Sequence, residues 1–352
     1  MIAFVSKRLS ILVLTTLCLT FAVFYLTNLH PNLEKLAKTQ ANMRMTDKQV
    51  ENWLFVNGYK RPVMLHYGEW LGIVKGWTYV DKDENLTGRC IDKRKKKKLG
   101  DTNFPKYCGV LQGTLGYSTV FKENSEVIIL RRLALTGKLM FWVMVTMVPL
   151  ALIVGIIAGM REGSRTDRSL STFSIISTAT PEYVSGVIFI IIFSSSAVGL
   201  KWFKGTATSA MDDMNFWNFT LPVMTMTLYG MGYIARMTRA SMTEVMTSQY
   251  IRTARLKGVK FINIVLKHAL RNALIAPFTV IMLQFPWLLT GVVIVETLFN
   301  YKGFGWTLIY AAGNNDIELL LSCSIVAVMV VLLTQLISDI GYVFLNPRIR
   351  VN

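Results

Sequence analysis

Residues 139–160 read LMFWVMVTMVPLALIVGIIAGM, a run of 22 positions without a charged side chain. A bilayer core about 30 Å thick is crossed by roughly 20 apolar residues in a helix. In hydrocarbon an open strand edge would leave backbone N–H and C=O groups unpaired, so a run of this kind must be helical. The stretch therefore predicts a membrane-spanning helix, and it sets the fold class of the chain.

Runs of similar character lie on both sides of it. The other predicted spans are residues 9–29, 170–200, 214–235, 273–295 and 319–338, and Glu182 interrupts the run at 170–200. Together with 139–160 they predict an all-α polytopic membrane protein with six transmembrane helices.

The composition agrees with this fold class. Hydrophobic residues make up 52% and charged residues 17% of the 352 residues, which is more apolar than an ordinary soluble domain and excludes a disordered chain. The formal net charge is +17, and a membrane explains that excess as well as a nucleic acid would. We expect no nucleic-acid partner, because the cationic run at 93–98 has no stacking aromatic residues around it.

Lys and Arg in the short loops orient the spans, because cytoplasmic loops carry an excess of these cations. The loop at 161–169 holds three and the loop at 236–272 holds eight, against three in the loops on the other side. We therefore expect both termini inside and residues 31–132 outside. That segment is basic, but segments longer than about 60 residues translocate largely regardless of charge.

The first span has a second reading as a cleaved signal peptide, because Lys7 and Arg8 precede it. Its apolar run is longer than the about 7 to 15 residues of a usual signal peptide. It also leads into Asn28 and Pro31 rather than into a small-residue cleavage site. We expect it to remain as a membrane anchor.

The outer segment is predicted to hold a short helix at 46–58 and a disulfide. Thr46 and Gln49 have capping-box spacing, and Gly58 would end the helix. Cys90 and Cys108 lie 18 residues apart, and an oxidising periplasm would let them bond. Two free thiols remain the alternative.

The inner loop between the fourth and fifth spans is too basic to insert into the bilayer. Apolar residues recur in it at helical spacing, which predicts an amphipathic helix outside the bilayer that Gly258 interrupts. A second helical pattern at 262–270 leads up to the fifth span. The residues alone leave two readings open. The segment is either an interfacial helix whose arginines bind anionic headgroups, or a protruding helix that a cytoplasmic partner binds. The apolar face consists of Met242, Val245, Met246, Tyr250 and Ala254.

Six strings of sequence decide between these readings. They are TDKQVENWLFVNGYKRPVMLHYGEWL at 46–71, GTLGYSTVFKENSEVIILRRL at 113–133, STATPEYVSGVIFI at 177–190, YIRTARLKGVKFINIVLKHALRNALIAPFTV at 250–280, ETLFNYKGFGWTLIYAA at 296–312 and DIGYVFLNPRIR at 339–350. In this order, and over nearly the whole chain, they resemble the ATP-binding-cassette importer permeases of the dipeptide, oligopeptide and nickel family.

The resemblance implies a domain organisation. Residues 1–30 would be the cytoplasmic N-terminus with the first span, and 31–132 a periplasmic segment with an insertion at about 77–109. Residues 133–345 would be the five-helix core of a type I, MetI-like importer, containing the coupling loop 236–274, and 346–352 a cytoplasmic tail. The chain would lie in a bacterial inner membrane.

It also implies the site and the partners. The partners would be a second homologous permease, two cytoplasmic ATP-binding subunits and a periplasmic solute-binding protein. The chain would need no cofactor of its own, since the partner subunits bind and hydrolyse ATP. Peptides would be the cargo, with nickel, opines or glycosides as alternatives within the same class. The residues implied to contact the ATPase are Tyr250, Arg252, Thr253, Ala254, Arg255, Lys257 and Gly258.

The coupling loop departs from the general importer pattern at two points, of which the second is its end, where residues 268–271 read HALR in place of Ile-x-Leu-Pro. That pattern begins Glu-Ala-Ala, whereas Arg252, Thr253 and Ala254 stand here. A role for the usual acidic residue therefore does not carry over to this chain, although the docking geometry does.

Glu182, which follows Pro181, is the one charge in the middle of a predicted span. A carboxylate there is costly, so it should face the pore or a partner helix. Three readings stay open: contact with the amino terminus of a peptide, pairing with the sister permease, or a tolerated polar site near water.

A rival function is a proton-coupled secondary transporter with Glu182 and Asp339 as its relay. Such transporters tend to show internal symmetry, and we see none in this sequence. An enzyme is not expected, because no Walker-type motif occurs and His30, His66 and His268 are far apart. Catalytic and metal-binding residues are accordingly predicted to be absent.

Overall fold

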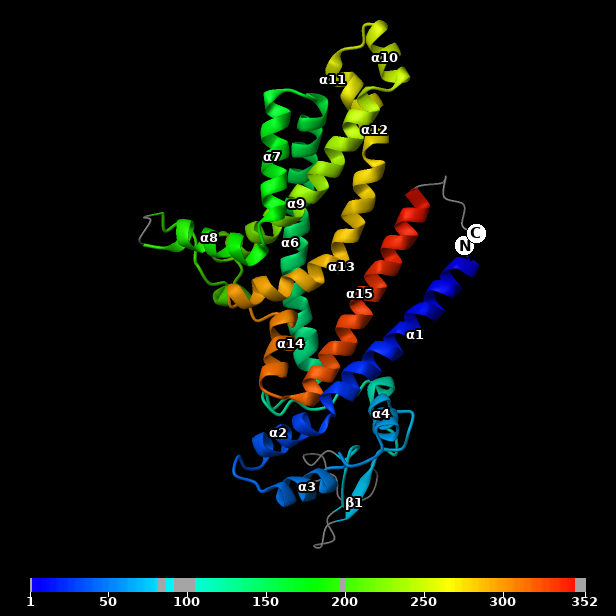
Figure 1. The fold of residues 1–352 in the computed structure, drawn as a ribbon, viewed down its shortest axis with the longest axis vertical. Helices are drawn as coiled ribbons and strands as arrows, with labels where there is room; N and C mark the ends of the chain where they lie inside the picture. The colour runs from blue at the N-terminus through cyan, green and yellow to red at the C-terminus, as the bar shows by residue number, and fades with distance from the viewer. Residues whose placement is uncertain (1, 81–85, 92–104, 197–199, 346–352) are drawn as a thin grey trace. The chain divides into compact units, whose positions relative to one another are not determined.

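The computed structural model describes residues 2–80, 86–91, 105–196 and 200–345, and these are predominantly helical (Figure 1). The cationic run at 93–98, most of the predicted insertion around it and the tail at 346–352 lie outside the described residues.

The elements of the first part of the chain are α1 (Ile2–Thr27), α2 (His30–Gln40), α3 (Asp47–Val56), α4 (Val63–Leu71), β1 (Thr78–Val80), β2 (Leu86–Gly88), the 3₁₀ turn η1 (Val110–Gln112) and α6 (Ser125–Met160). Then follow α7 (Arg165–Ala179), α8 (Glu182–Ser194), the 3₁₀ turn η2 (Thr208–Met211), α9 (Phe216–Met246), α10 (Gln249–Leu256), α11 (Phe261–Asn263), the π-helix η3 (Ile264–Ala269), α12 (Leu270–Ala273), α13 (Ile275–Leu298), α14 (Phe304–Gly313) and α15 (Ile317–Leu345). Strands β1 and β2 pair antiparallel, with Tyr79 opposite Thr87.

Several helices have the length and apolar character of membrane spans. In the described residues three qualify: Arg8–Thr27, Ser125–Met160 and Ile317–Gly341. Two bent pairs raise the number to five if each pair is one span: α7 with α8, bent by 105°, and Phe261–Ala273 with Ile275–Leu289, bent by 52°. The predicted span at 214–235, which lies in α9, is not among them.

Burial explains why α9 differs. The helix packs against α7, α8, α12 and α13, and its buried residues include Asn218, Thr225 and Thr227. Thr225 Oγ1, for example, donates to the carbonyl of Leu221 at 2.8 Å. Because these polar side chains are covered by other helices, α9 does not need the uniform apolar surface of a helix in contact with lipid.

The chain divides into two compact units. The first is Met1–Arg8, Arg132–Trp306 and Val330–Asn352, and the second is Leu9–Arg131 with Thr307–Met329. The first unit contains α7 to α13 and a core that includes Leu139, Met147, Met226 and Ile234. In it, Arg8 pairs with Asp339 at 3.1 Å.

The second unit packs α2, α3 and α4 into a core of their own. Phe24, Leu54 and Trp70 are each 1% exposed there. The helix predicted at 46–58 is present as α3, with a capping box between Thr46 and Gln49. Gly58 follows its end at a φ of 79°, the left-handed conformation in which glycine ends helices.

His66 on α4 is buried in this core, between the rings of Phe24 and Tyr59. Burial, together with the nearby charges of Arg89 and Arg61, lowers the pKa of His66 to about 4. In the unfolded chain the pKa of histidine is about 6.5. Between these two values the unfolded state binds a proton that the folded state does not, so folding becomes less favourable as the pH falls.

We therefore expect His66 to make the protein acid-sensitive between pH 6.5 and pH 4. The free energy of unfolding should drop by about 2 kcal/mol between pH 7.5 and pH 5 on this group's account. His66→Phe keeps the ring contacts and removes the titration, so it serves as the control. Urea unfolding of the full chain in detergent, followed by tryptophan fluorescence, measures the difference. Equal pH dependence in the two proteins would contradict the assignment.

Candidate functional site

The loop between α9 and α13 forms the end of the first unit at which α10 and α11 lie (Figure 1). It contains α10, Gly258, α11, η3 and α12 in that order. The loop therefore has a helical structure of its own and is not an irregular tether.

Its buried face holds the loop against the helices beneath it. Ile251 of α10 is fully buried, and Ala254 is 8% exposed. They share a cluster with Met242 near the end of α9 and with the η3 residues Ile264 and Val265. Ile156 and Met160 of α6 pack against the same cluster. A movement of α10 is thus transmitted by direct packing to the ends of α6 and α9.

The sequence predicts one continuous amphipathic helix with Met242 to Ala254 on its apolar face. This prediction is wrong, because the helix is interrupted and the residues after the break point in other directions than expected. Helix α9 ends at Met246, and α10 begins after Ser248, whose backbone is extended with φ −67° and ψ 152°. The Ser248 hydroxyl donates to the carbonyl of Val245 at 2.6 Å, a local bond that competes with the helix, and the extended backbone at Ser248 resets the helical phase. As a result Ile251 takes the buried position, and Tyr250 is 42% exposed.

Gly258 ends α10 in a Schellman motif. Val259 N donates to the carbonyl of Ala254 at 3.2 Å, and Gly258 N donates to that of Arg255 at 3.0 Å. This pair of hydrogen bonds defines the motif, and the residue in the Gly258 position adopts positive φ, here 73°. A Cβ at this position would meet no atom within 4 Å, so the glycine is needed for its backbone conformation and not for space.

Beyond Gly258 the chain returns to α13 through a tight connection. Residues 264–269 form a π-helix, an element that frequently marks functional sites. Asn272 Nδ2 donates to the Tyr250 hydroxyl at 3.0 Å, which joins α12 to α10. Ser241 Oγ donates to the carbonyl of Ala273 at 2.8 Å, which joins α9 to the end of α12.

The second predicted pattern, at 262–270, is only partly buried. Val265 and Ala269 are in the cluster, but Ile262 and Leu266 are 65% and 60% exposed. The wider turn of the π-helix shifts the side chains away from the 3.6-residue period on which the prediction rested.

The outer face of the loop is strongly basic. Between Glu244 and Glu296 the sequence has no Asp or Glu, so every charged side chain of the loop is a cation. Leu256 is 82% exposed and Phe261 is 51% exposed among these charges. The sequence pattern missed both residues, because Leu256 is the last residue of α10 and Phe261 precedes the second pattern at 262–270. The exposed cations are Arg252, Arg255, Lys257, Lys260, Lys267 and Arg271.

The structure therefore brings the predicted coupling residues together on one short helix and its cap. Of these, Arg252, Thr253, Arg255 and Lys257 are exposed, whereas Ala254 belongs to the buried face. Such a surface, with an apolar tip and a cationic rim over a packed base, is suited to bind an acidic-rimmed groove on another protein.

Pro181 and Glu182 lie at the bend between α7 and α8, away from the loop. Proline restricts the residue before it to extended backbone, and Thr180 has φ −86° and ψ 121°. This breaks the predicted span 170–200 into two helices. Glu182 is the first residue of α8 and is partly exposed, a position where the helix dipole favours a negative charge. The three readings of Glu182 remain open.

Cys90 and Cys108 are joined by a disulfide in the second unit, with their Cα atoms 5.5 Å apart. The bond lies against Gly76, whose backbone N–H donates to the carbonyl of Lys106 at 3.0 Å. Across the described part of the chain, no three His, Cys, Asp or Glu side chains gather as metal ligands.

The chain is similar to several bacterial transport proteins. Relatives include a probable peptide ABC transporter permease of Sinorhizobium fredii, 33% identical over 68% of this chain and 77% of its own length. The di/tripeptide transport system permease DppB of Pseudomonas aeruginosa is 28% identical over 99% of both chains. The oligopeptide transport system permease AppB of Bacillus subtilis is 30% identical over 72% of this chain and 83% of its own.

The chain also has a likeness to a solved structure. A chain of the inward-facing MetNI methionine ABC transporter is 18% identical, with a TM-score of 0.45 over 62% of this chain and 94% of that one.

A family model covers the part of the chain that contains the loop. Residues 151–351 match the model described as "Binding-protein-dependent transport system inner membrane component". This range extends from the middle of α6 through the coupling loop to the C-terminal end of the chain. The chain therefore belongs to the family of binding-protein-dependent transport system inner membrane components.

Proposed function

We propose that this chain is the permease subunit of an ATP-driven importer for peptides. It forms half of a pore with a second homologous permease, and it is spanned by six helices with both termini in the cytoplasm. Two ATPase subunits bind on the cytoplasmic side, and a periplasmic solute-binding protein delivers the substrate. The chain itself hydrolyses nothing.

The observation that carries the proposal is the basic loop of residues 249–273. It is exposed, it has no acidic residue, and its base is packed onto α6 and α9. Family membership and relatives named as peptide permeases support the same assignment. A loop that served only to bind headgroups would not require the fixed Schellman turn and the Tyr250–Asn272 hydrogen bond.

The geometry then gives a mechanism. When ATP closes the ATPase subunits, the groove that holds α10 moves. The buried contacts of Ile251 and Ala254 pass this movement to α9, and the Tyr250–Asn272 hydrogen bond passes it through α12 to α13. Alternating access follows as a switch between two states, biased by nucleotide inside and by the loaded binding protein outside.

The rival function, a proton-coupled transporter with Glu182 and Asp339 as relay, is less well supported. Glu182 begins α8 and Asp339 lies on α15, where it is held in an ion pair with Arg8 at 3.1 Å.

Uptake driven by ATP distinguishes the two functions. The complete complex is reconstituted in vesicles with ATP inside the compartment that holds the ATPase subunits, and the probes are radiolabelled dialanine, trialanine and pentaalanine, with Ni²⁺ as a further cargo. We expect uptake of at least one peptide that requires ATP and persists when a protonophore collapses the proton gradient. Uptake that stops with the protonophore and continues without ATP would establish the rival function instead. Uptake of Ni²⁺ alone would keep the importer and overturn the cargo.

A further inference from the structure

A buried ion pair joins α7 to α9 within the first unit. Asp167, in the first turn of α7, is 2% exposed. Arg239 of α9 donates to it through two nitrogens: Nε reaches Oδ1 at 2.5 Å, and a terminal guanidinium nitrogen reaches Oδ2 at 2.8 Å. A bidentate pair of this kind fixes orientation as well as distance.

The same carboxylate also fixes the turn that precedes α7. The backbone N–H of Gly163 donates to Oδ2 at 2.9 Å, and the Ser171 hydroxyl donates to Oδ1 at 3.1 Å. Ser164 caps the helix by accepting from the Asp167 N–H at 3.1 Å. Asp167 therefore binds the turn after α6, the first turns of α7 and the side of α9 at one point.

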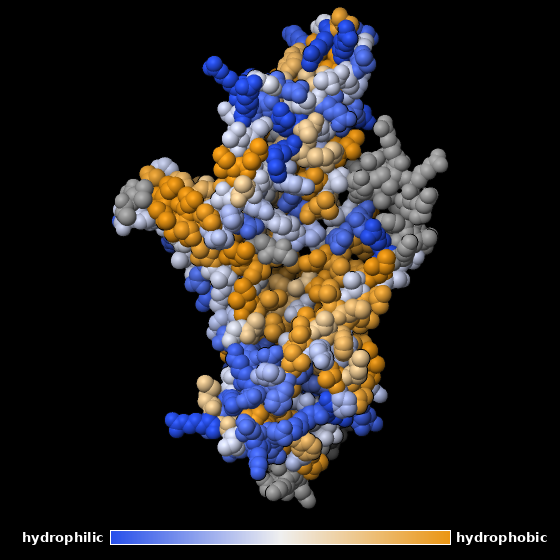
Figure 2. Space-filling model, in the orientation of Figure 1, coloured by the Kyte–Doolittle hydropathy of each residue, from blue (hydrophilic) through white to orange (hydrophobic). Residues whose placement is uncertain are grey.

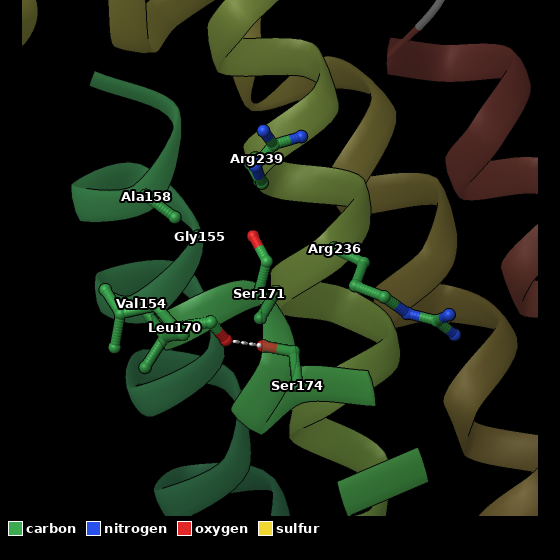
Figure 3. A pocket seen from close by; sticks show the side chains of 9 residues that line it. Val154, Gly155, Ala158, Leu170, Ser171, Ser174, Arg236 and Arg239 are labelled. Atoms are coloured by element: carbon green, nitrogen blue, oxygen red, sulfur yellow. Dashed lines mark hydrogen bonds between the residues drawn. The ribbon is translucent and has the colours of Figure 1, made fainter. Parts of the chain in front are cut away.

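Two glycines near the ion pair allow α6 to approach α9 closely. A Cβ on Gly155 would lie 2.5 Å from the carbonyl oxygen of Ala235, and one on Gly159 would lie 2.8 Å from that of Arg239. The crevice between α6, α7 and α9 is lined by Gly155, Ala158, Ser171, Ser174, Arg236 and Arg239 (Figure 3). It has no interior room for a water molecule, so it is a packed contact and not a binding site.

The pair lies next to the base of the coupling loop. Arg239 comes three residues before Met242, which is fully buried in one cluster with Ile251 and Ala254 of α10. Ser241, between them, bonds to Ala273 at the end of the loop. Any displacement that α10 imposes on the end of α9 therefore reaches Arg239 within one helical turn.

We propose that Asp167 and Arg239 are positioning residues that couple the loop to α7 and, through the bend at Pro181, to α8. The inference rests on the proposed function. Packing of Ile251 and Ala254 moves α9, but α9 and α7 meet largely through small and polar side chains such as Gly232 and Ser177, which offer little resistance to sliding. The bidentate pair prevents that sliding, so that the α7–α8 arm follows α9 during each ATP cycle.

The primary test is Asp167→Asn in the reconstituted complex. Asparagine has the shape of aspartate and can still accept from Gly163, and the Arg239 side chain is 33% exposed, so water can solvate it. We expect ATP hydrolysis to stay within about twofold of the wild type while peptide uptake falls at least tenfold. The number of ATP molecules hydrolysed per peptide would therefore rise by a factor of about five or more. Arg239→Lys, which keeps the charge but not the two-point contact, should lie between these proteins.

The matched control is Arg236→Gln. This arginine lines the same crevice, one turn earlier on α9, and its guanidinium lies over the ring of Tyr233. Its loss should leave the ratio of ATP hydrolysed to peptide transported unchanged. A role in folding alone would lower hydrolysis and uptake together in proportion to the amount of protein in the membrane, and it would not change this ratio.

A covalent bridge tests the same idea without relying on Asp167→Asn. Asp167→Cys and Arg239→Cys are combined in a background with Cys18→Ser and Cys323→Ala, and a bifunctional methanethiosulfonate links the two new thiols. We expect the linker to lower the ratio of ATP to peptide towards the wild-type value, and to do nothing in Asp167→Cys alone.

Two results would overturn the proposal. One is a wild-type ratio in Asp167→Asn present at normal level in the membrane. The other, decisive if that variant is not inserted, is an unchanged ratio on bridging the double cysteine variant. A wild-type complex without any ATP-driven uptake would be a different failure, that of the proposed function.

Discussion

We expect peptide uptake to fall at least tenfold when Arg255 is replaced by glutamate, while the protein still inserts into the membrane at its normal level. This result is expected because Arg255 is exposed on α10 and shows no packing role, so its reversal leaves the fold intact. A partner that binds this surface meets no negative charge between Glu244 and Glu296, so we expect its own contact surface to be acidic. Like charges brought together at an interface cost several kcal/mol, and each about 1.4 kcal/mol is tenfold in affinity.

Two substitutions at Gly258 test the charge of this surface separately from its backbone conformation. Asn and Asp both tolerate positive φ better than other residues with a Cβ, and a Cβ at Gly258 meets no atom within 4 Å. Gly258→Asn should therefore keep most of the uptake, whereas Gly258→Asp should lose it as Arg255→Glu does.

The measurements are ATP-driven uptake and co-purification of the ATPase subunits with the permease. The charge-reversal control is Arg165→Glu, at the first residue of α7, where an acidic side chain suits the helix N-terminus. Normal uptake and normal ATPase binding in Arg255→Glu and Gly258→Asp would show that the coupling surface lies elsewhere. Failure of Arg165→Glu to retain uptake would show that charge on this side of the membrane matters in general.

Replacement of Glu296 by alanine should destabilise the first unit more than any other single change considered. Glu296 is fully buried near the end of α13. It accepts a hydrogen bond from the Thr136 hydroxyl of α6 and another from the backbone N–H of Trp306 at 2.8 Å. Thr136 in turn accepts from the Phe304 N–H at 2.8 Å. One carboxylate thus holds the start of α14 and the loop before it against α6.

The expected cost is about 3–5 kcal/mol, because alanine would leave buried backbone donors without an acceptor. Gly303 and Gly305 approach the carboxylate so closely that a Cβ on either would touch it. The loop has therefore little freedom to find other partners. In a protein of this size, the midpoint of thermal unfolding in detergent should fall by about 5–10 °C.

Glu296→Gln should lie between alanine and the wild type, since one acceptor oxygen remains. Glu123→Ala is the control, because its ion pair with Arg131, at 3.4 Å, is exposed at the surface and such pairs contribute little. A midpoint within about 1 °C of the wild type for Glu296→Ala would contradict the network.

The exposed surface of the first unit differs in hydropathy from one segment to another. Figure 2 shows hydrophobic side chains over α8 and hydrophilic ones around the loop of α10 and α11. The large apolar residues exposed on α6 and α8, such as Phe141 and Ile191 at 61% and 50%, belong to segments that the apolar pattern assigns to the membrane. In such segments lipid or a partner subunit takes the place of a protein core.

Local signals in the sequence determined much of this protein. The uncharged run at 139–160 lies within α6, the capping box at Thr46 starts α3, and Gly258 ends α10 with positive φ. The order of six strings determined the family, which the match over residues 151–351 confirms. The apolar run, the capping box and the glycine C-cap each depend on residues within a few turns of one another, so the chain carries that information locally.

Only the tertiary structure decided the rest. Asp167 and Arg239 are 72 residues apart in sequence, and Thr136 and Glu296 are 160 apart. No periodicity or motif relates such residues, because their contact depends on how whole helices pack. The phase of α10 and the 105° bend between α7 and α8 depend on a single N-cap and a single proline in their packed surroundings. The sequence therefore predicted where a partner-binding loop lies, whereas the burial of one helix against another decided which of its side chains are packed and which are exposed.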